Sequence, residues 1–278
     1  MGPMIDVEEW PELHEPVMVV ALTGWVDAGI AGAGALAALH AQLEDGRTFG
    51  RIDLADLADL SETRPTVHLV DGVTREIEWP SLDLVSGRLG GDVVLVTGPE
   101  PAARWKAVVS ELVDIAVRLG VSGVYTLGGM PASVSHRRPV RVLATAGDPD
   151  RAREVGALRL DYTGPIGLAT VLQVELGRMG VPGVGLWAQV PHYVSANASP
   201  VAVSALLARL RELTGLDLDA RVLDEAGDAY RARLEEELAE RPDVAEIVRT
   251  LDALQEPEHL PTGDELASEI ERFLREQH

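Results

Sequence analysis

The stretch "VMVVALTGWVDAGIAGAGALAALHAQL", residues 17–43, decides the fold class. Residues 17–23 are continuously apolar and rich in valine, which is typical of a strand buried on both faces. Asp27 is a candidate helix N-cap, and the Ala- and Leu-rich run after it predicts a helix. Three glycines in that run weaken the helix unless it packs very closely on the sheet. A buried strand that leads directly into a helix indicates an α/β protein.

The same alternation continues along the chain. Buried strands are predicted at 92–98, 122–129, 140–146 and 184–190, and helices at 101–120, 166–180 and 200–214. Strands that alternate with helices of this length predict a mostly parallel sheet with helices on both faces. Residues 66–79 predict a β-hairpin that turns at Asp71-Gly72, which suggests that the sheet is mixed.

Composition changes near residue 217. Residues 217–278 contain 19 acidic and 7 basic side chains. We therefore expect an α/β core over 1–216 and an acidic helical extension over 217–278. The extension reads as two helices separated by Arg241-Pro242, a linker at 256–263 and a last helix. One apolar stripe of that helix contains Leu266, Ile270, Phe273 and Leu274. Such a stripe must dock on the core or on a neighbouring subunit, so we expect a homo-oligomer.

The overall composition excludes several classes of protein. The formal net charge is −21, which argues against nucleic acid and anionic membranes as partners. No cysteine occurs, which excludes disulfides and thiolate chemistry. Every apolar stretch is interrupted before 18 residues, and no secretory signal opens the chain, so we expect a cytoplasmic protein without a membrane span.

Candidate functional residues lie where four predicted strands end. Ligands of open parallel sheets bind beyond the carboxyl ends of the strands. The loops that leave those ends are 23–29, 97–102, 127–139 and 191–200. If the four strands are parallel, these loops form one rim, which is a candidate pocket or protein-contact surface.

The first rim loop contains Gly24, Trp25 and Asp27 at the expected start of a helix. Backbone N–H groups at such a position can bind an anion. The P-loop and dinucleotide-binding glycine patterns are both absent, however, and Asp27 would repel an anion. A ligand role and simple helix capping by Asp27 therefore both remain open.

The loop at 127–139 contains Gly128 and Gly129, which we expect to let the backbone turn at the sheet edge, and Pro131. Ser133, Ser135 and His136 follow. Neighbouring Ser and His residues do not form a catalytic set by themselves, and no G-x-S-x-G elbow occurs in the chain. We expect a polar loop here.

The last strand contributes Trp187, and Pro191, His192 and Tyr193 follow it directly. The two rings could supply an acid–base pair or a stacking surface, or simply pack over the end of the sheet. No second histidine stands at metal-binding spacing. We therefore predict no catalytic residue, no metal and no cofactor.

Several segments together resemble a known family. "PVMVVALTGWVDAG", "TLGGMPASVSHRRPVRVLATAGD", "YTGPIGLATVL", "LWAQVPHYV" and "PTGDELASEIERFLRE" occur in this order. They are similar to the actinobacterial branch of the proteasome assembly chaperone 2 family. The resemblance implies a three-layer αβα sandwich like that of nucleoside phosphorylases and related hydrolases. It also implies binding to protein subunits, among them proteasome subunits, and self-association.

Two functions remain as expectations. The first is a non-enzymatic assembly factor that binds protein subunits. The second is a small-molecule binder or an enzyme of the nucleoside phosphorylase or hydrolase type, with its pocket at the rim; Arg137 and Arg138 would then be the cations near a phosphate. An ATP-grasp-type ligase is not expected, because the single lysine, Lys106, lies within a predicted helix.

Overall fold

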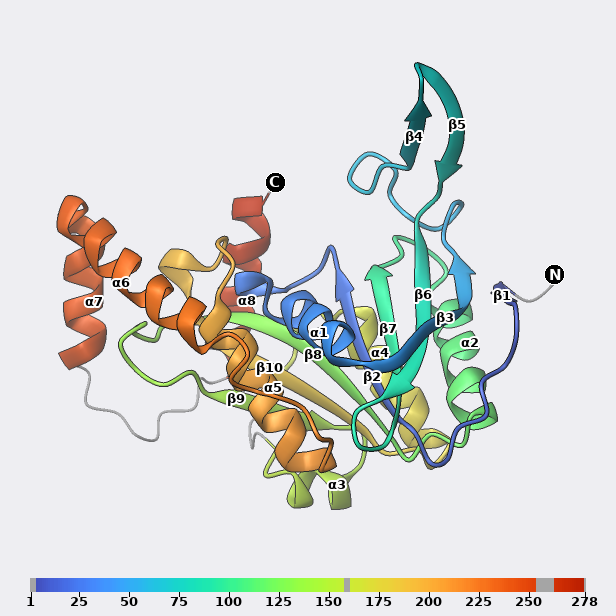
Figure 1. Ribbon diagram of the computed structural model, residues 1–278. Coiled ribbons are helices and arrows are strands. Elements are labelled where there is room, and N and C mark those ends of the chain that lie inside the picture. Colours follow the sequence, from blue (N-terminus) through green and yellow to red (C-terminus); the bar gives the residue numbers. More distant parts are fainter. Residues whose placement is uncertain (1–3, 158–160, 254–262, 278) are drawn as a thin grey trace.

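An eight-stranded mixed sheet organises the chain (Figure 1). The computed structural model describes residues 4–157, 161–253 and 263–277. In order across the sheet, the strands are β1 (Ile5–Val7), β3 (Glu44–Asp53), β6 (Ser81–Arg88), β7 (Asp92–Pro99), β2 (Val17–Thr23), β8 (Gly123–Ala132), β10 (Gly183–Pro191) and β9 (Val142–Ala146).

The centre of the sheet is parallel, as the sequence predicts. Strands β7, β2, β8 and β10 all run in one direction. The antiparallel strands lie at the two sides: β9 pairs with β10, and β1, β3 and β6 extend the sheet beyond β7. The sheet is therefore mixed because antiparallel pairs at its two sides flank a parallel centre.

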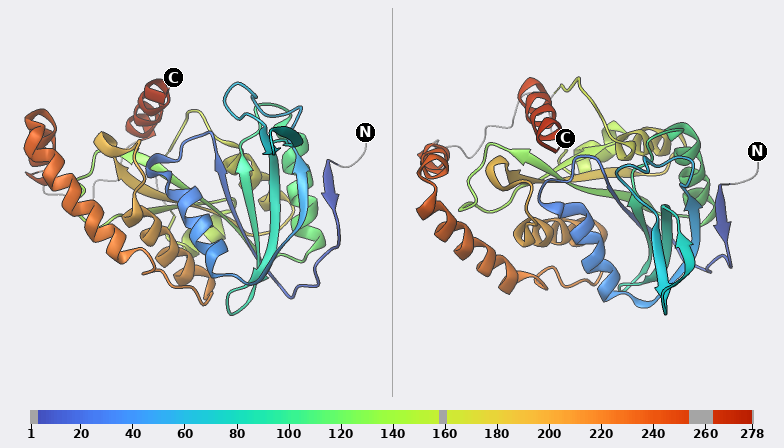
Figure 2. Two further views of the ribbon diagram at one scale, coloured as in Figure 1. Left: turned by 45° about the horizontal axis from the view of Figure 1, so that its top comes forward. Right: turned by 90° about the horizontal axis from the view of Figure 1, so that it is seen from above.

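Helices cover both faces of the sheet, which confirms the three-layer αβα architecture (Figure 2). Helices α1 and α5 cover one face, and α2 and α4 cover the other; α3 is a short helix after β9. The bounds are α1 (Ala31–Gln42), α2 (Trp105–Arg118), α3 (Pro149–Glu154), α4 (Leu168–Arg178) and α5 (Pro200–Thr214).

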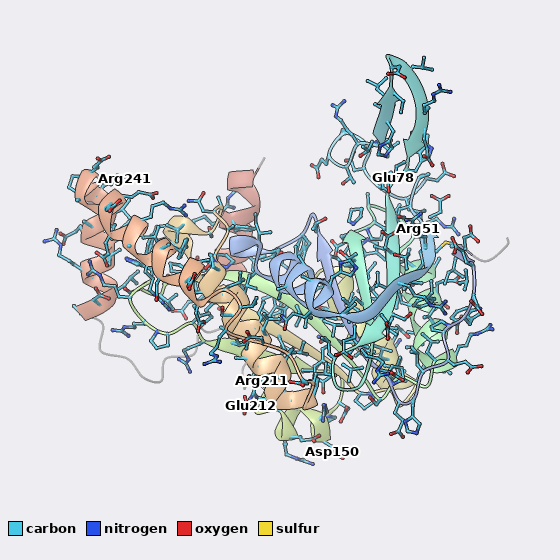
Figure 3. The ribbon with its side chains drawn as sticks, in the orientation of Figure 1. Arg51, Glu78, Asp150, Arg211, Glu212 and Arg241 are labelled. Carbon is cyan, nitrogen blue, oxygen red and sulfur yellow. The ribbon has the colours of Figure 1, made fainter. Side chains whose placement is uncertain are left out.

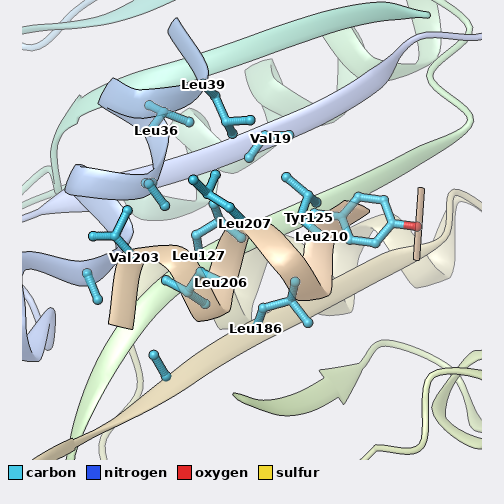
Figure 4. Packing of buried hydrophobic residues seen from close by; sticks show 14 of the residues in the cluster. Val19, Leu36, Leu39, Tyr125, Leu127, Leu186, Val203, Leu206, Leu207 and Leu210 are labelled. Atoms are coloured by element: carbon cyan, nitrogen blue, oxygen red, sulfur yellow. The ribbon is translucent and has the colours of Figure 1, made fainter. Parts of the chain in front are cut away.

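The core on the α1/α5 side is almost purely aliphatic (Figure 4). Leu36 and Leu39 of α1 and Leu206 and Leu210 of α5 belong to one buried cluster with residues of β2, β8 and β10. These leucines are at most 3% exposed. Burial of one such side chain stabilises the fold by roughly 1.5–3 kcal/mol, so this layer fixes the positions of both helices.

The predicted hairpin forms, but it does not belong to the main sheet. Strands β4 (Thr66–Val70) and β5 (Val73–Glu78) make a separate two-stranded sheet. Figure 1 shows this hairpin projecting away from the body of the molecule, and Figure 3 shows Glu78 at its base. The expectation that the hairpin makes the main sheet mixed is therefore wrong.

The acidic extension forms α6 (Asp224–Glu240), α7 (Pro242–Ala253) and α8 (Gly263–Gln277). Helix α6 packs on α5, and α8 packs on β8. Phe273 of α8 is buried in the core cluster, and Ile270 packs against it. Part of the apolar stripe of the last helix therefore packs on the α/β core of the same chain. The side chains of Leu266 and Leu274, and most of the predicted linker, lie outside the described residues. No helix in the described part of the chain is long and apolar enough to cross a membrane.

Candidate functional site

The four predicted loops do meet at one rim, where the parallel strands end. Backbone hydrogen bonds connect three of them directly. The N–H of Glu100 after β7 donates to Thr23 O of β2 at 2.7 Å. The N–H of Gly29 donates to Ser195 O at 2.7 Å, and Ser199 N–H donates back to Gly29 O at 2.8 Å. The loops after β2, β7 and β10 therefore form one continuous backbone network.

Asp27 is hydrogen-bonded to the backbone within the protein. Its Oδ1 accepts N–H bonds from Gly32 at 2.7 Å and Gly129 at 2.9 Å, and its Oδ2 accepts one from Ala33 at 3.1 Å. Burial raises the pKa of this carboxyl, although the three N–H donors act in the opposite direction. Asp27 therefore caps the helix, as one of the two sequence alternatives proposed, and also fastens α1 to β8. The helix begins at Ala31, after a 3₁₀ turn, η1 (Ala28–Ile30).

Gly128 and Gly129 are not turn residues, and this expectation is corrected. Both lie within β8, which continues to Ala132 and so includes Pro131. A Cβ on Gly129 would lie 1.9 Å from Ala28 O, and one on Gly128 would lie 2.8 Å from the Trp187 ring. Glycine is needed because the backbone of η1 and the indole of β10 approach this strand too closely for any side chain.

Sequence reasoning missed Glu100, although it lies within a rim loop. Its Oε1 accepts the N–H of Leu168 at 2.6 Å, at the first residue of α4. The Trp25 indole packs beside it, against Gly167. Burial raises the pKa of Glu100 to about 7, although the Leu168 hydrogen bond lowers it. Gly24 lies exposed on the same loop as Trp25, with φ +94°. A lone glutamate after a strand gives no motif by which sequence alone could single it out.

His136 and Tyr193 meet as sequence placement suggested, but within a structural network. The Tyr193 hydroxyl lies 2.8 Å from His136 Nδ1 and accepts the His136 N–H at 2.9 Å. His136 Nε2 lies 3.1 Å from Glu235 Oε1 of α6. The imidazole is 2% exposed, and burial raises the pKa of Tyr193 to about 12. Both ring nitrogens thus have partners within the chain, the Tyr193 hydroxyl at Nδ1 and a Glu235 carboxylate oxygen at Nε2.

The loop that follows β8 binds the acidic extension. Arg137 donates to both carboxylate oxygens of Glu235, at 2.6 and 2.7 Å, and to Asp252 Oδ2 at 2.8 Å. Arg138 donates to Asp252 O at 3.0 Å, and the Ser133 hydroxyl donates to Glu269 of α8 at 2.9 Å. The arginines that could have met a phosphate therefore hold α6 and α7.

A cavity of about 880 Å³ lies at this end of the rim. Pro131, His136 and Pro191 line it, but Trp25 and Trp187 do not. His192 stacks edge-on against Tyr193 with ring centroids 5.5 Å apart, in the short 3₁₀ helix η2 (His192–Val194). The predicted rim therefore divides into a Glu100–Trp25 end and a cavity end. Across the described residues, no group of three His, Asp or Glu side chains could hold a metal.

Comparisons with known proteins agree with this architecture. The model of the PAC2 family matches residues 21–238. A PAC2 family protein from Streptomyces avermitilis is 41% identical, with a TM-score of 0.77; the alignment covers 84% of this chain and 99% of that one. A Mycobacterium tuberculosis proteasome-assembly chaperone homologue is 36% identical, with a TM-score of 0.76 and the same coverages.

A second protein from Mycobacterium tuberculosis, of unknown function, is 26% identical and has a TM-score of 0.85. It is similar over 98% of this chain and 97% of its own length, so the likeness includes the acidic extension. A search of curated proteins gave no match.

Proposed function

Because the chain belongs to the PAC2 family, we propose that it is a non-enzymatic assembly factor that binds protein subunits, and that proteasome subunits are its partners. The observation that carries this proposal is the β4–β5 hairpin. Every residue of both strands is exposed. A two-stranded hairpin is marginally stable in water by itself, so one that stands clear of the core is typical of a contact element.

One face of the hairpin is apolar. Val67 pairs with Ile77, and Leu69 lies two residues beyond Val67 on the same strand. Because alternate strand residues share a face, these side chains lie together, and Trp79 continues their row at the base. They are 48–64% exposed. The opposite face carries His68, Glu76 and Glu78, with the exposed Val70–Val73 pair beside the turn. A contiguous exposed apolar face bordered by charge is a mark of protein–protein contact.

Part of the rim supports the same reading, because His136, Arg137 and Asp27 already have partners within the chain. His136 is held between Tyr193 and Glu235, and Asp27 accepts three backbone N–H bonds. The nucleoside phosphorylase alternative is less well supported. It needs cations around a phosphate, and Arg137 is engaged by Glu235 and Asp252.

The choice of proteasome subunits as partners rests on the 36% identical relative named as a proteasome-assembly chaperone homologue. Self-association is part of the proposal too. The hairpin face can pair with a second copy until a subunit replaces it, because both contacts would bury the same apolar side chains.

The experiment is native mass spectrometry of the purified chain with proteasome α and β precursors from the organism that encodes it. Two double variants test the hairpin: L69S/I77S changes the apolar face, and H68S/E76S changes the polar face. We expect the wild type and H68S/E76S to form a defined complex and L69S/I77S to lose it. The proposal fails if the wild type forms no complex, or if both double variants bind equally well.

A further inference from the structure

The cavity at the rim lies between the α/β core and the acidic extension. Its volume of about 880 Å³ is within the range of small-molecule sites, roughly 300–1,000 Å³. The core supplies the ends of β8 and β10 and the loop between β8 and β9, and the extension supplies α6, α7 and α8. Much of the wall is apolar: Met130, Pro131, Val140, Pro191, Val201 and Leu251.

One buried hydroxyl in this wall lacks a partner, and an amide side chain lines the same cavity. Tyr230 of α6 is 3% exposed, and its hydroxyl makes no hydrogen bond among the described residues; Ser199, its polar neighbour, also lines the cavity. Gln189 of β10 is 6% exposed, and only its backbone forms a hydrogen bond within the described chain. A buried hydroxyl normally has a partner, so Tyr230 indicates a ligand with a hydrogen-bonding atom, and Gln189 offers such a ligand a further amide in the same cavity.

The charges of the wall restrict that ligand further. Arg141 is exposed at the cavity and forms no ion pair within the described part of the chain. The α8 side carries Asp264, Glu265 and Glu269; Glu269 is engaged by Ser133 and Arg272, and Glu265 is engaged as well. One available guanidinium attracts a single carboxylate, whereas the acidic side opposes phosphates and other polyanions.

We propose that this cavity binds a small amphipathic monocarboxylate, an apolar chain or ring system that carries one carboxylate group. The carboxylate pairs with Arg141, Gln189 and Tyr230 supply hydrogen bonds, and the apolar body lies along Met130 and Leu251. The hairpin takes no part in this site. The proposal is therefore independent of subunit binding, and either can fail without the other.

Ligand binding at this position stabilises the docked extension. Tyr230 and Leu251 belong to α6 and α7, so the complete site exists only while these helices are docked on the core. A ligand that binds only the docked state shifts the equilibrium toward it by mass action. Occupancy of the cavity would thereby protect arginines of the extension, such as Arg231 and Arg249, from trypsin.

The first test compares three probes by isothermal titration calorimetry: decanoate, decanol and decyltrimethylammonium. They share one apolar chain and differ in the charge of the head group. We expect decanoate to bind about five-fold more tightly than decanol, and the ammonium probe to bind weakest. Absence of decanoate binding, or binding of the ammonium probe as tight as that of decanoate, overturns the proposal.

Matched variants locate the binding. Arg141→Gln removes the proposed counter-ion, and Arg178→Gln removes the same charge from α4, outside the cavity. Arg141→Gln should abolish the preference for decanoate over decanol and leave decanol binding unchanged, whereas Arg178→Gln should bind all probes as the wild type does. Decanoate should also slow tryptic cleavage of the extension. The factor should be similar in the wild type and in L69S/I77S, because the hairpin takes no part in the site. Equal decanoate affinity in all variants, with no protection from trypsin, contradicts the assignment.

Discussion

Arg137 and Glu235 form a bidentate ion pair, with Nε–Oε1 and Nη2–Oε2 distances of 2.6 and 2.7 Å, although 98 residues separate them in the chain. Arg137 belongs to the loop after β8, and Glu235 belongs to α6. The pair joins the core to the acidic extension. The same carboxylate meets His136, so one glutamate connects the extension to both the loop surface and a buried ring.

Removing either partner of this ion pair should loosen the extension. We expect Arg137→Gln and Glu235→Gln each to increase tryptic cleavage within α6 and α7. In a double-mutant cycle on unfolding free energy, the coupling should be about 1 kcal/mol, because both side chains are nearly half exposed and solvent screens the pair. The Arg137 hydrogen bonds lower the pKa of Glu235 to about 2. The coupling should therefore be present above pH 4.5 and fade as the pH falls toward 2. A coupling near zero at pH 7 would contradict this account.

Asp27 should contribute more to stability than a surface helix cap does. Asp27→Ala leaves three partly buried N–H groups, of Gly32, Ala33 and Gly129, without their acceptor, and should lower the free energy of unfolding in urea by about 2–4 kcal/mol. Asp27→Asn keeps one acceptor oxygen and should lower the free energy of unfolding by about half as much as Asp27→Ala. If Asp27→Ala lowers the free energy of unfolding by no more than the roughly 1 kcal/mol of an ordinary helix cap, the hydrogen bond from the Gly129 N–H adds nothing to stability.

Gly129 should tolerate no side chain, because a Cβ there would lie 1.9 Å from a backbone oxygen that cannot move independently. We expect Gly129→Ala to lower the free energy of unfolding by about 3 kcal/mol or more. Gly91→Ala is the matched control, since its Cβ would meet only Leu216 Cδ2, at 3.8 Å, and it should change stability by less than about 1 kcal/mol. Similar losses in both variants would show that the close approach of η1 to β8 is not what requires glycine.

Sequence reasoning predicted the parts of the fold that rest on local pattern. The four central strands are continuous apolar runs, and α5 spans the predicted 200–214, between a proline and a glycine. Strand β3 escaped prediction because its first five residues are polar or glycine and are exposed. Strand β3 is defined mainly by its pairing with β6, and the residues of its first half carry no hydrophobic pattern that would predict a strand.

The sequence predicts where the candidate site residues lie, but not what their side chains do. Parallel strands placed the four loops on one rim, as expected. The partners of His136 and Arg137 come from α6 and α7, about 100 residues later, and no spacing rule connects them. In the sequence, Gly128 and Gly129 suggest a turn because glycine adopts turn conformations readily, whereas only the packed structure shows the neighbours that exclude a side chain.

Glu100 should give the stability of the protein a pH dependence that opposes that of Glu235. Burial between Trp25 and α4 raises its pKa from 4.5 to about 7 in the folded state, despite the Leu168 hydrogen bond. The folded protein therefore binds more protons than the unfolded chain between pH 4.5 and 7, and stability falls as the pH rises through that window.

Glu100→Gln tests this directly, because glutamine keeps an acceptor oxygen for the Leu168 N–H but cannot ionise. Unfolding free energies in urea would be measured for both proteins at pH 5, 6, 7 and 8. We expect the wild-type value to decline relative to the variant by on the order of 1 kcal/mol between pH 5 and 7, and then to level off. The full pKa shift would imply more, but the carboxyl is partly exposed and water screens it. Parallel curves for the two proteins would show that Glu100 is ionised at neutral pH and that its burial between Trp25 and α4 does not shift its titration.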